Sequence, residues 1–244
     1  MANEELNKGI EFLRGKLAVA QRVVVLTGAG ISAESGVPTF RGKDGLWKQH
    51  SAIDLATPEA FQRDSRLVWE FYNWRRELLF PLKPNAAHEA LVELEKRVPH
   101  FTLITQNIDG LHQVAGSRHV LELHGNIWWV RCTVCGQCYE ERTVPLPELP
   151  PCRACRKLLR PNVVWFGEML DSNVLGGAFN ALESSDVMIV IGTSGTVQPA
   201  ASMGMAAKRS GATVAEINLD PTPYTSIYHV GLAGKAGEIV PRLL

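Results

Sequence analysis

The chain of 244 residues carries 25 lysines and arginines against 25 aspartates and glutamates, and 45% of its residues are hydrophobic. This length and composition are typical of a globular protein with one large domain, or with one domain and a smaller satellite. The zero net charge excludes a general electrostatic attraction to nucleic acid or to an anionic membrane, and no apolar run approaches the roughly 20 residues that span a bilayer.

The start of the chain, Met1 to Glu5, has neither the apolar core of a secretion signal nor the composition of a transit peptide. We therefore expect a cytoplasmic protein with no membrane partner. In that reducing compartment, the five cysteines are expected to be metal ligands or catalytic groups rather than disulfides.

Apolar residues at helical spacing predict a first helix over Leu6–Val19, and the β-branched run that follows predicts a buried strand over Arg22–Thr27. Similar short runs predict four more strands, with helical patterns between them. These strands are predicted over Phe101–Thr105, Val120–Leu123, Val187–Ile191 and Thr213–Ile217, and the helices over Asn85–Arg97 and Gly195–Ser210. Because parallel strands buried on both faces have this composition, the alternation predicts an α/β fold with right-handed crossovers.

A glycine-rich turn follows the first strand. Gly28-Ala29-Gly30-Ile31-Ser32-Ala33 fits G-x-G-x-x-G/A, in which backbone N–H groups approach a pyrophosphate, although ordinary strand-to-helix turns also match it. Gly36-Val37-Pro38 ends the next helix early, and no acidic residue follows about 20 residues downstream, as a dinucleotide fold usually requires. We expect a dinucleotide bound in a modified way, which disfavours an ordinary NAD dehydrogenase.

Two segments do not fit the sheet pattern and are expected to be insertions. Ser51–Leu82 is predicted to be helical and rich in aromatic residues, and Trp128–Pro161 carries cysteines. Cys132-x-x-Cys135 and Cys152-x-x-Cys155 are 16 residues apart, as in a structural Cys₄ zinc site. Cys135 and Cys138 form a second C-x-x-C, but the outer set is preferred because Cys132 would otherwise lie unpaired beside the metal. Buried free thiols are the alternative.

The predicted strand ends carry polar residues where open α/β sheets bind ligands. Gln106 to His112 follows one strand, and His124-Gly125-Asn126 follows the next. His124 is the candidate general base, because an imidazole titrates near neutral pH. The six other histidines are interpreted as structural.

The motifs GAGISAESGVPTFRG, TQNIDGLH, LELHGN, the paired C-x-x-C, RPNVVWFGE and GTS together resemble the sirtuins, which are NAD-dependent protein lysine deacylases. The resemblance runs from about Leu17 to Pro241. It implies a Rossmann-like parallel sheet domain with a small inserted zinc-binding and helical domain, and a cleft between them for NAD and an acyl-lysine peptide. The implied boundaries are 1–36, 84–126 and 164–244 for the Rossmann-like domain, 37–83 for the cofactor-binding loop and helical module, and 127–163 for the Cys₄ zinc module.

The resemblance also assigns roles by position. His124 would be the catalytic base, with Asn107 and Asp109 beside it. A cofactor-binding loop would run from Gly28 to Trp47. NAD contacts would come from Gly28, Ala29, Gly30, Ala33, Thr39, Phe40, Arg41, Trp47, Gln106, Asn107, Ile108, Asp109, Gly192, Thr193, Ser194, Asn218, Leu219, Asp220 and Ala236. The acyl-lysine would be flanked by Val163, Val164, Trp165, Phe166 and Gly167, with the peptide added as a strand. No role is implied for Asn162, where relatives often carry His or Asp.

The sequence offers no obvious carboxylate pair of the glycosidase type. The implied chemistry does not need one, because nicotinamide is already a cationic leaving group. The acyl oxygen attacks the ribose to give an imidate, and His124 deprotonates a ribose hydroxyl that then takes the acyl group. The products are lysine, nicotinamide and O-acyl-ADP-ribose.

Tyr72 and Arg75 are three residues apart on a predicted helix and so share a face. In sirtuins, Tyr-x-x-Arg here marks the prokaryotic desuccinylase and demalonylase subclass (class III), because a guanidinium and a phenol can bind a distal carboxylate. Ala56 resembles the enlarged acyl pocket of that subclass. The alternative is that Tyr72 and Arg75 only decorate a solvated helix face.

Two other functions remain open from sequence. Protein ADP-ribosylation would use the same NAD cleavage with another acceptor. A zinc-ribbon binding module is the second alternative, although nucleic acid is not an expected partner because the basic residues are few. Those in the zinc module are Arg142, Arg153, Arg156, Lys157 and Arg160. A monomer is favoured; the targets and the main acyl group are not determined by the sequence.

Overall fold

The large domain is built on one parallel sheet, seen in a computed structural model that describes residues 2–38, 46–47 and 50–244. Its six strands lie in the order β11-β10-β9-β1-β4-β5. Their bounds are Arg22–Thr27 (β1), His100–Thr105 (β4), Val120–Glu122 (β5), Val187–Ile191 (β9), Thr213–Asn218 (β10) and Val230–Ala233 (β11). Every pairing between them is parallel. The predicted α/β class is therefore confirmed.

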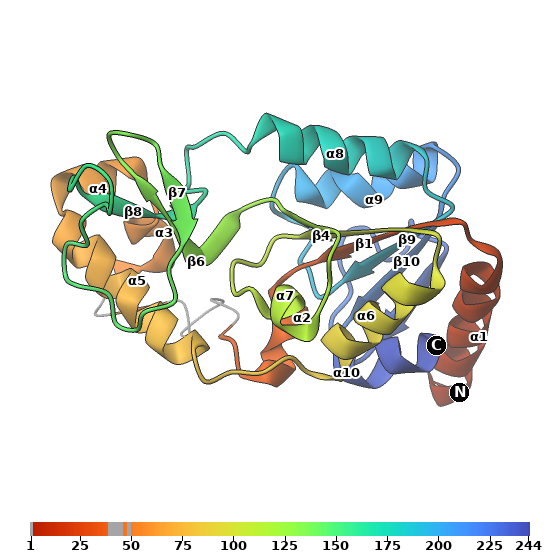
Figure 1. Cartoon of the computed structure of the whole chain (residues 1–244). Helices are drawn as coiled ribbons and strands as arrows, with labels where there is room; N and C mark the ends of the chain where they lie inside the picture. The colour runs from red at the N-terminus through yellow and green to blue at the C-terminus, as the bar shows by residue number, and fades with distance from the viewer. Residues whose placement is uncertain (1, 39–45, 48–49) are drawn as a thin grey trace.

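Helices cover both faces of this sheet, with α8 and α9 on one face and α1, α6 and α10 on the other (Figure 1). These helices span Ala2–Val19 (α1), Ala86–Arg97 (α6), Ser172–Glu183 (α8), Ala200–Arg209 (α9) and Ala236–Ile239 (α10), and a 3₁₀ helix over Val240–Leu243 follows. Successive strand residues face opposite sides, so Val23 and Val25 pack toward α1 and α6, whereas Val24 and Leu26 pack toward α8 and α9. Burial on both faces explains the continuous apolar run.

Some predicted bounds differ from the structure. The helix predicted over Gly195–Ser210 begins only at Ala200, because Gly195 has a φ of 66° that no helix allows. The helix predicted from Leu6 already begins at Ala2. Strand β11 and helix α8 were not anticipated, since the strand is short and contains Gly231 and the helix contains two adjacent glycines.

The small domain combines helices with a separate antiparallel sheet and has its own core (Figure 1). The helices are α3 (Ala52–Leu55), α4 (Pro58–Arg63) and α5 (Ser65–Leu79), and the sheet order is β7-β6-β8, from Cys138–Glu140, Gly125–Cys132 and Leu159–Val163. A two-stranded hairpin, β2 (Leu46–Trp47) and β3 (His50–Ser51), precedes them. Thr57 and Asp64 begin α4 and α5 by accepting hydrogen bonds from the first turn. The predicted insertion of a helical and cysteine-bearing unit is confirmed.

Two short helices lie at the junction of the domains. Helix α2 (Ala29–Ser32) continues into a 3₁₀ turn at Ala33–Ser35, and α7 (Leu111–Ala115) follows β4. Gly36 ends the 3₁₀ turn with a φ of 92°, which is why the predicted helix stops there. Across the described part of the chain, no helix combines the length and apolarity of a membrane span.

Candidate active site

A cavity of about 500 Å³ lies between the two domains, at the carboxyl ends of the parallel strands. Open α/β sheets bind ligands at this edge. The predicted residues that line it are Gly28, Ala29, Tyr72, Arg75, Gln106, Asn107, Ile108, Asp109, His124, Val163, Val164, Trp165, Phe166, Gly167, Gly192, Thr193 and Ser194. The structure thus gathers segments that are far apart in sequence around one space.

The glycine turn packs directly against the turn that follows β9. Gly28 N–H donates to the Ile191 carbonyl (2.9 Å) and Gly30 N–H to the Gly192 carbonyl (2.8 Å). A Cβ on Gly30 would lie 2.7 Å from Gly192 Cα, closer than real Cβ atoms approach. The glycines are therefore required by this close contact between two turns, a reason that the sequence motif alone does not reveal.

His124 is held in one tautomer by the backbone. Its Nδ1 lies 2.9 Å from the Gln106 carbonyl oxygen, which can only accept a hydrogen bond. Nδ1 therefore carries the proton, and the lone pair of Nε2 is available in the cavity. Burial lowers the pKa of His124, and the hydrogen bond to Gln106 opposes that shift. The ring is accordingly neutral at neutral pH, which is the state a general base requires.

Asp109 and Asn107 belong to a buried network centred on Ser32. The Ser32 hydroxyl donates to Asp109 Oδ2 (2.8 Å), and Asn107 Nδ2 donates to Ser32 Oγ (3.2 Å) and to the Gly28 carbonyl (3.1 Å). Leu111 N–H donates to Asp109 Oδ1 (2.9 Å), and burial raises the pKa of this carboxyl group. Sequence analysis missed Ser32, whose only signal is a polar side chain inside the glycine turn.

Two buried histidines extend this network. His88 Nε2 lies 3.5 Å from Ser32 Oγ, its Nδ1 accepts from Asn85 N–H (3.3 Å), and burial lowers its pKa to about 4. His112 Nε2 lies 3.0 Å from Thr27 Oγ1, and burial lowers its pKa well below the usual range. Both imidazoles are fully buried, and the lowered pKa values keep them neutral at neutral pH.

A second cavity of about 200 Å³ lies beside the first, and both are lined by Gly192. Its walls include the predicted residues Gly30, Ala33, Asn218, Leu219 and Ala236, and also Glu34, Ile217, Gly234 and Lys235. Asn218 Nδ2 donates to the Thr193 carbonyl (2.7 Å), which ties β10 to the turn after β9. Asp220 is exposed and lines neither cavity. Glu34 was missed, and its carboxylate accepts from Gly237 N–H at the start of α10 (2.7 Å).

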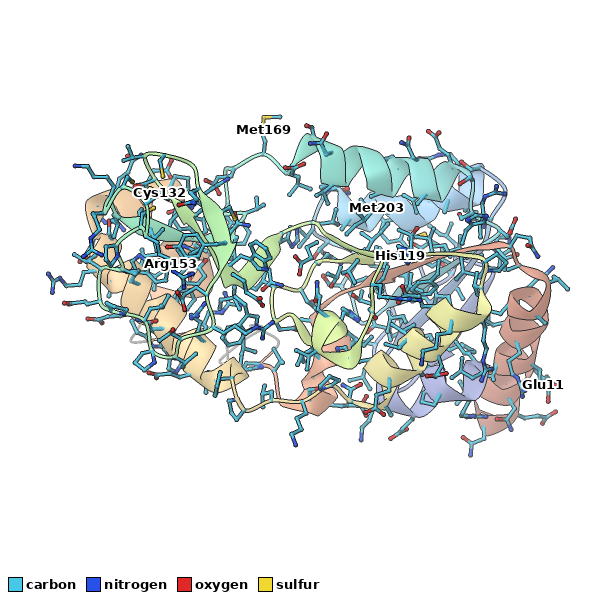
Figure 2. All side chains as sticks on the ribbon, viewed as in Figure 1. Glu11, His119, Cys132, Arg153, Met169 and Met203 are labelled. Carbon is cyan, nitrogen blue, oxygen red and sulfur yellow. The ribbon has the colours of Figure 1, made fainter. Side chains whose placement is uncertain are left out.

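Four cysteines lie together in the small domain, where Figure 2 labels Cys132. The sulfurs of Cys132, Cys135, Cys152 and Cys155 all lie within 4.8 Å of one another. Two backbone N–H groups donate to the Cys132 sulfur and help to lower the pKa of its thiol to about 6. Four thiolates with this spacing are positioned to bind one zinc ion, with no coordination position left for water. The outer register of the C-x-x-C pairs is thus the one that the fold assembles, without Cys138.

Not every predicted cofactor contact lies in the cavities. Thr39, Phe40 and Arg41 lie outside the described residues. Trp47 is buried in the core of the small domain, with its ring 5.6 Å from that of Phe71, and it lines neither cavity.

Tyr72 and Arg75, both on α5, line the large cavity on the side of the small domain. Burial raises the pKa of the Tyr72 phenol, so the hydroxyl keeps its proton at neutral pH. Burial also lowers the pKa of Arg75, although a guanidinium stays charged in proteins. Ala56, Leu79 and Ile108 line the same cavity. A phenol and a cation therefore line a partly apolar space.

A parallel sheet that binds a ligand at its carboxyl edge, beside a neutral histidine, is the architecture of a nucleotide-dependent α/β enzyme. Comparison with known proteins is consistent with this class. The model of the Sir2 family matches residues 28–199. An NAD-dependent protein deacylase of Aquifex aeolicus is 55% identical over 88% of this chain and 90% of its own length. NAD-dependent protein deacylase 1 of Archaeoglobus fulgidus is 51% identical over 96% of each chain.

Solved structures of Sir2 proteins have the same fold as this chain. A Sir2 homologue in complex with NAD superposes with a TM-score of 0.91 at 51% identity, over 96% of this chain and 91% of that chain. A Sir2 protein bound to an acetylated peptide superposes with a TM-score of 0.84 at 34% identity, over 96% and 95% of the two chains. The chain belongs to the Sir2 family, which confirms the resemblance to sirtuins.

Proposed function

We propose that this chain, an NAD-dependent protein deacylase like its relatives, removes succinyl and malonyl groups as well as acetyl groups from protein lysines. The observation that carries the proposal is the position of Tyr72 and Arg75 in the same cavity as His124. A cation and a phenol in that place suit an acyl chain that ends in a carboxylate. A cytoplasmic location is part of this proposal, because four of the five cysteines are placed to bind a metal rather than to form disulfides.

The two neighbouring cavities fit the two halves of NAD. The smaller one, with Asn218 and Ala236, would hold the adenosine half, and Gln106 to Asp109 would surround the nicotinamide end. Gln106 Nε2 donates to Thr193 Oγ1 (3.0 Å), which ties these two regions together. Bound NAD supplies a cationic nicotinamide leaving group and a ribose that accepts the acyl group.

His124 would act as the general base of the transfer. Its unprotonated Nε2 can take a proton from a hydroxyl group in the cavity. The positive charge that then forms on the ring is stabilised by the Nδ1–H bond to the Gln106 carbonyl, 2.9 Å away. Asn107 and Asp109, fixed through Ser32, would orient the groups around the leaving nicotinamide.

The segment after β8 offers carbonyls to a peptide. The N–H groups of Val164, Trp165 and Phe166 already donate within the protein, to the His124 carbonyl (2.9 Å), Glu168 Oε2 (2.8 Å) and the Ala56 carbonyl (2.9 Å). Among the described residues, no donor reaches the carbonyl oxygens of Val164 and Phe166. These oxygens are therefore available to the amide N–H groups of an acyl-lysine peptide, a more limited pairing than a fully added strand.

The acyl preference can be tested on one lysine peptide that carries acetyl, malonyl or succinyl. NAD-dependent release would be followed by mass spectrometry, which also separates O-acyl-ADP-ribose from an ADP-ribosylated protein. Arg75→Met should lower kcat/KM for succinyl at least about tenfold more than for acetyl, because a hydrogen bond to a charged group contributes ~1.5–3 kcal/mol. Equal losses for the two acyl groups would remove Arg75 from the acyl pocket.

The role of His124 has a separate test. His124→Ala should nearly abolish turnover of every acyl peptide and leave NAD binding, measured by calorimetry, close to that of the unchanged enzyme. Retained deacylation would refute the role of general base.

A further inference from the structure

A chain of contacts links the segment after β8 to Tyr72 in the wall of the cavity. Arg160 forms a bidentate ion pair with Glu168, with Nη1–Oε1 at 2.6 Å and Nη2–Oε2 at 2.8 Å. Glu168 Oε2 also accepts from Trp165 N–H (2.8 Å), and Trp165 Nε1 donates to Tyr72 Oη (2.9 Å). Glu168, Arg160 and Trp165 thereby fix the surroundings of the Tyr72 hydroxyl.

The indole ring of Trp165 has little freedom to turn. Its side chain is only 2% exposed, the guanidinium carbon of Arg160 lies 3.5 Å from the ring centroid, and the Phe61 ring lies 5.1 Å away. Arg160 is itself held by Glu168 and by the Val163 carbonyl, to which its Nη2 donates at 3.0 Å. The direction of the indole N–H is therefore set by packing on several sides.

This indole determines what the Tyr72 hydroxyl can do. An indole N–H can only donate, so the oxygen of Tyr72 accepts and its own hydrogen must point elsewhere. Among the described residues, the hydrogen bond from Trp165 Nε1 is the one found at this hydroxyl, and no acceptor is found for its hydrogen. Tyr72 lines the cavity and is buried, so its hydrogen is available to a ligand there.

We propose that Trp165 is a positioning residue for acyl specificity: its N–H occupies the acceptor side of Tyr72 Oη and thereby presents the phenolic O–H as a donor to the distal carboxylate of the acyl group. The inference rests on the proposed removal of dicarboxylic acyl groups. Tyr72 and Arg75 line the same cavity, and a phenolic O–H and a guanidinium are donors that match the acceptors of a carboxylate. An acyl chain that ends in a methyl group gains nothing from this arrangement.

The test compares succinyl-lysine with butyryl-lysine in one peptide, because the two acyl groups have the same carbon count and differ in the terminal carboxylate. The ratio of their kcat/KM values would be measured for Trp165→Phe, Tyr72→Phe and the double variant. Trp69→Phe is the matched control, since Trp69 is another buried tryptophan whose Nε1 donates to a backbone carbonyl, that of Leu159, at 2.9 Å.

Trp165→Phe should lower the succinyl-to-butyryl ratio about fivefold, and Tyr72→Phe about tenfold, as expected for hydrogen bonds that serve a charged group. The double variant should match Tyr72→Phe alone, because Trp165 acts only through that hydroxyl. Trp69→Phe should lower the melting temperature but keep the ratio within about twofold of the unchanged enzyme. Benzothienylalanine at position 165, which replaces the indole N–H by sulfur at nearly constant shape, should reproduce the loss even where Trp165→Phe folds poorly.

The outcomes separate the two claims. If Tyr72→Phe lowers the ratio and neither replacement of Trp165 does, the proposed removal of dicarboxylic acyl groups stands and the positioning role is lost. The positioning role would also be overturned if Trp165→Phe lowered the succinyl-to-butyryl ratio equally in the unchanged enzyme and in the Tyr72→Phe variant. If the unchanged enzyme does not remove succinyl, the proposed function fails and the inference fails with it; if it removes succinyl no better than butyryl, the inference alone fails.

Discussion

Arg76 is buried between the helical and zinc-binding parts of the small domain, and replacing it by methionine should destabilise the fold. Its side chain is 0% exposed. Nη1 donates to the Ile127 carbonyl (2.5 Å), and Nη2 donates to the carbonyls of Glu141 and Thr143. Burial lowers the pKa of Arg76 to about 10, so the group remains a cation at neutral pH. Methionine keeps much of the length and removes every donor.

The size of the effect follows from the carbonyls left behind. A buried acceptor that loses its partner costs about 1–3 kcal/mol. The bond to Ile127 is fully buried, whereas those to Glu141 and Thr143 are partly buried and cost less. We expect a total loss of about 3 kcal/mol, which for a chain of this length lowers the melting temperature by roughly 6–12 °C.

Differential scanning calorimetry of the zinc-loaded protein measures this change. Arg66→Met is the matched control, because Arg66 lies on the same helix and forms an ion pair with Glu148 in which both side chains are about half exposed. Such surface pairs contribute about 0–1 kcal/mol. A fall of less than about 2 °C for Arg76→Met, or equal falls for the two variants, would refute the reasoning.

Three other predictions follow from the geometry. Gly30→Ala should lower the free energy of unfolding, measured in urea, by more than about 2 kcal/mol, because its Cβ meets the backbone of Gly192. Gly15→Ala, in an exposed helix position with nothing within 4 Å, should raise that free energy by about 0.5–1 kcal/mol, and effects of the same sign in the two variants would contradict this reasoning. The acid limb of the kcat/KM profile should lie below pH 6.5, because burial lowers the pKa of His124 and activity is lost when the falling pH protonates it; a limb above that value would exclude this base. Cys152→Ser should lose the bound zinc and unfold the small domain, while Cys138→Ser should retain one zinc per chain by atomic absorption; zinc loss in both would place Cys138 among the ligands.

Local signals explain what could be predicted. Strand β1 and the glycine turn after it are recognisable because apolar runs and glycines act within a few residues. The spacing of Cys132, Cys135, Cys152 and Cys155 predicts the metal site for the same reason. Strand β11 was not predicted because its side chains give little periodic signal. Its place in the sheet is decided by pairing with β10.

Contacts between distant residues could not be predicted. Helical spacing alone places Tyr72 and Arg75 on one face, but it does not say that this face looks into the cavity or that the adjacent Arg76 is buried against the zinc-binding sheet. Nothing in the sequence marks Ser32, and the expectation that Trp165 flanks the acyl-lysine does not reveal its bond to Tyr72. Their partners, Asp109 and Tyr72, are 77 and 93 residues away.

The sequence by itself therefore determined the α/β class, the metal ligands and the segments that carry the chemistry, since these depend on short-range periodicity and spacing. Only the tertiary structure decided which nitrogen of His124 is free, why Gly30 must lack a side chain and which group donates to the Tyr72 oxygen. Each of these depends on a carbonyl, a turn or an indole supplied by another part of the chain, because hydrogen bonds and packing act through space rather than along the sequence.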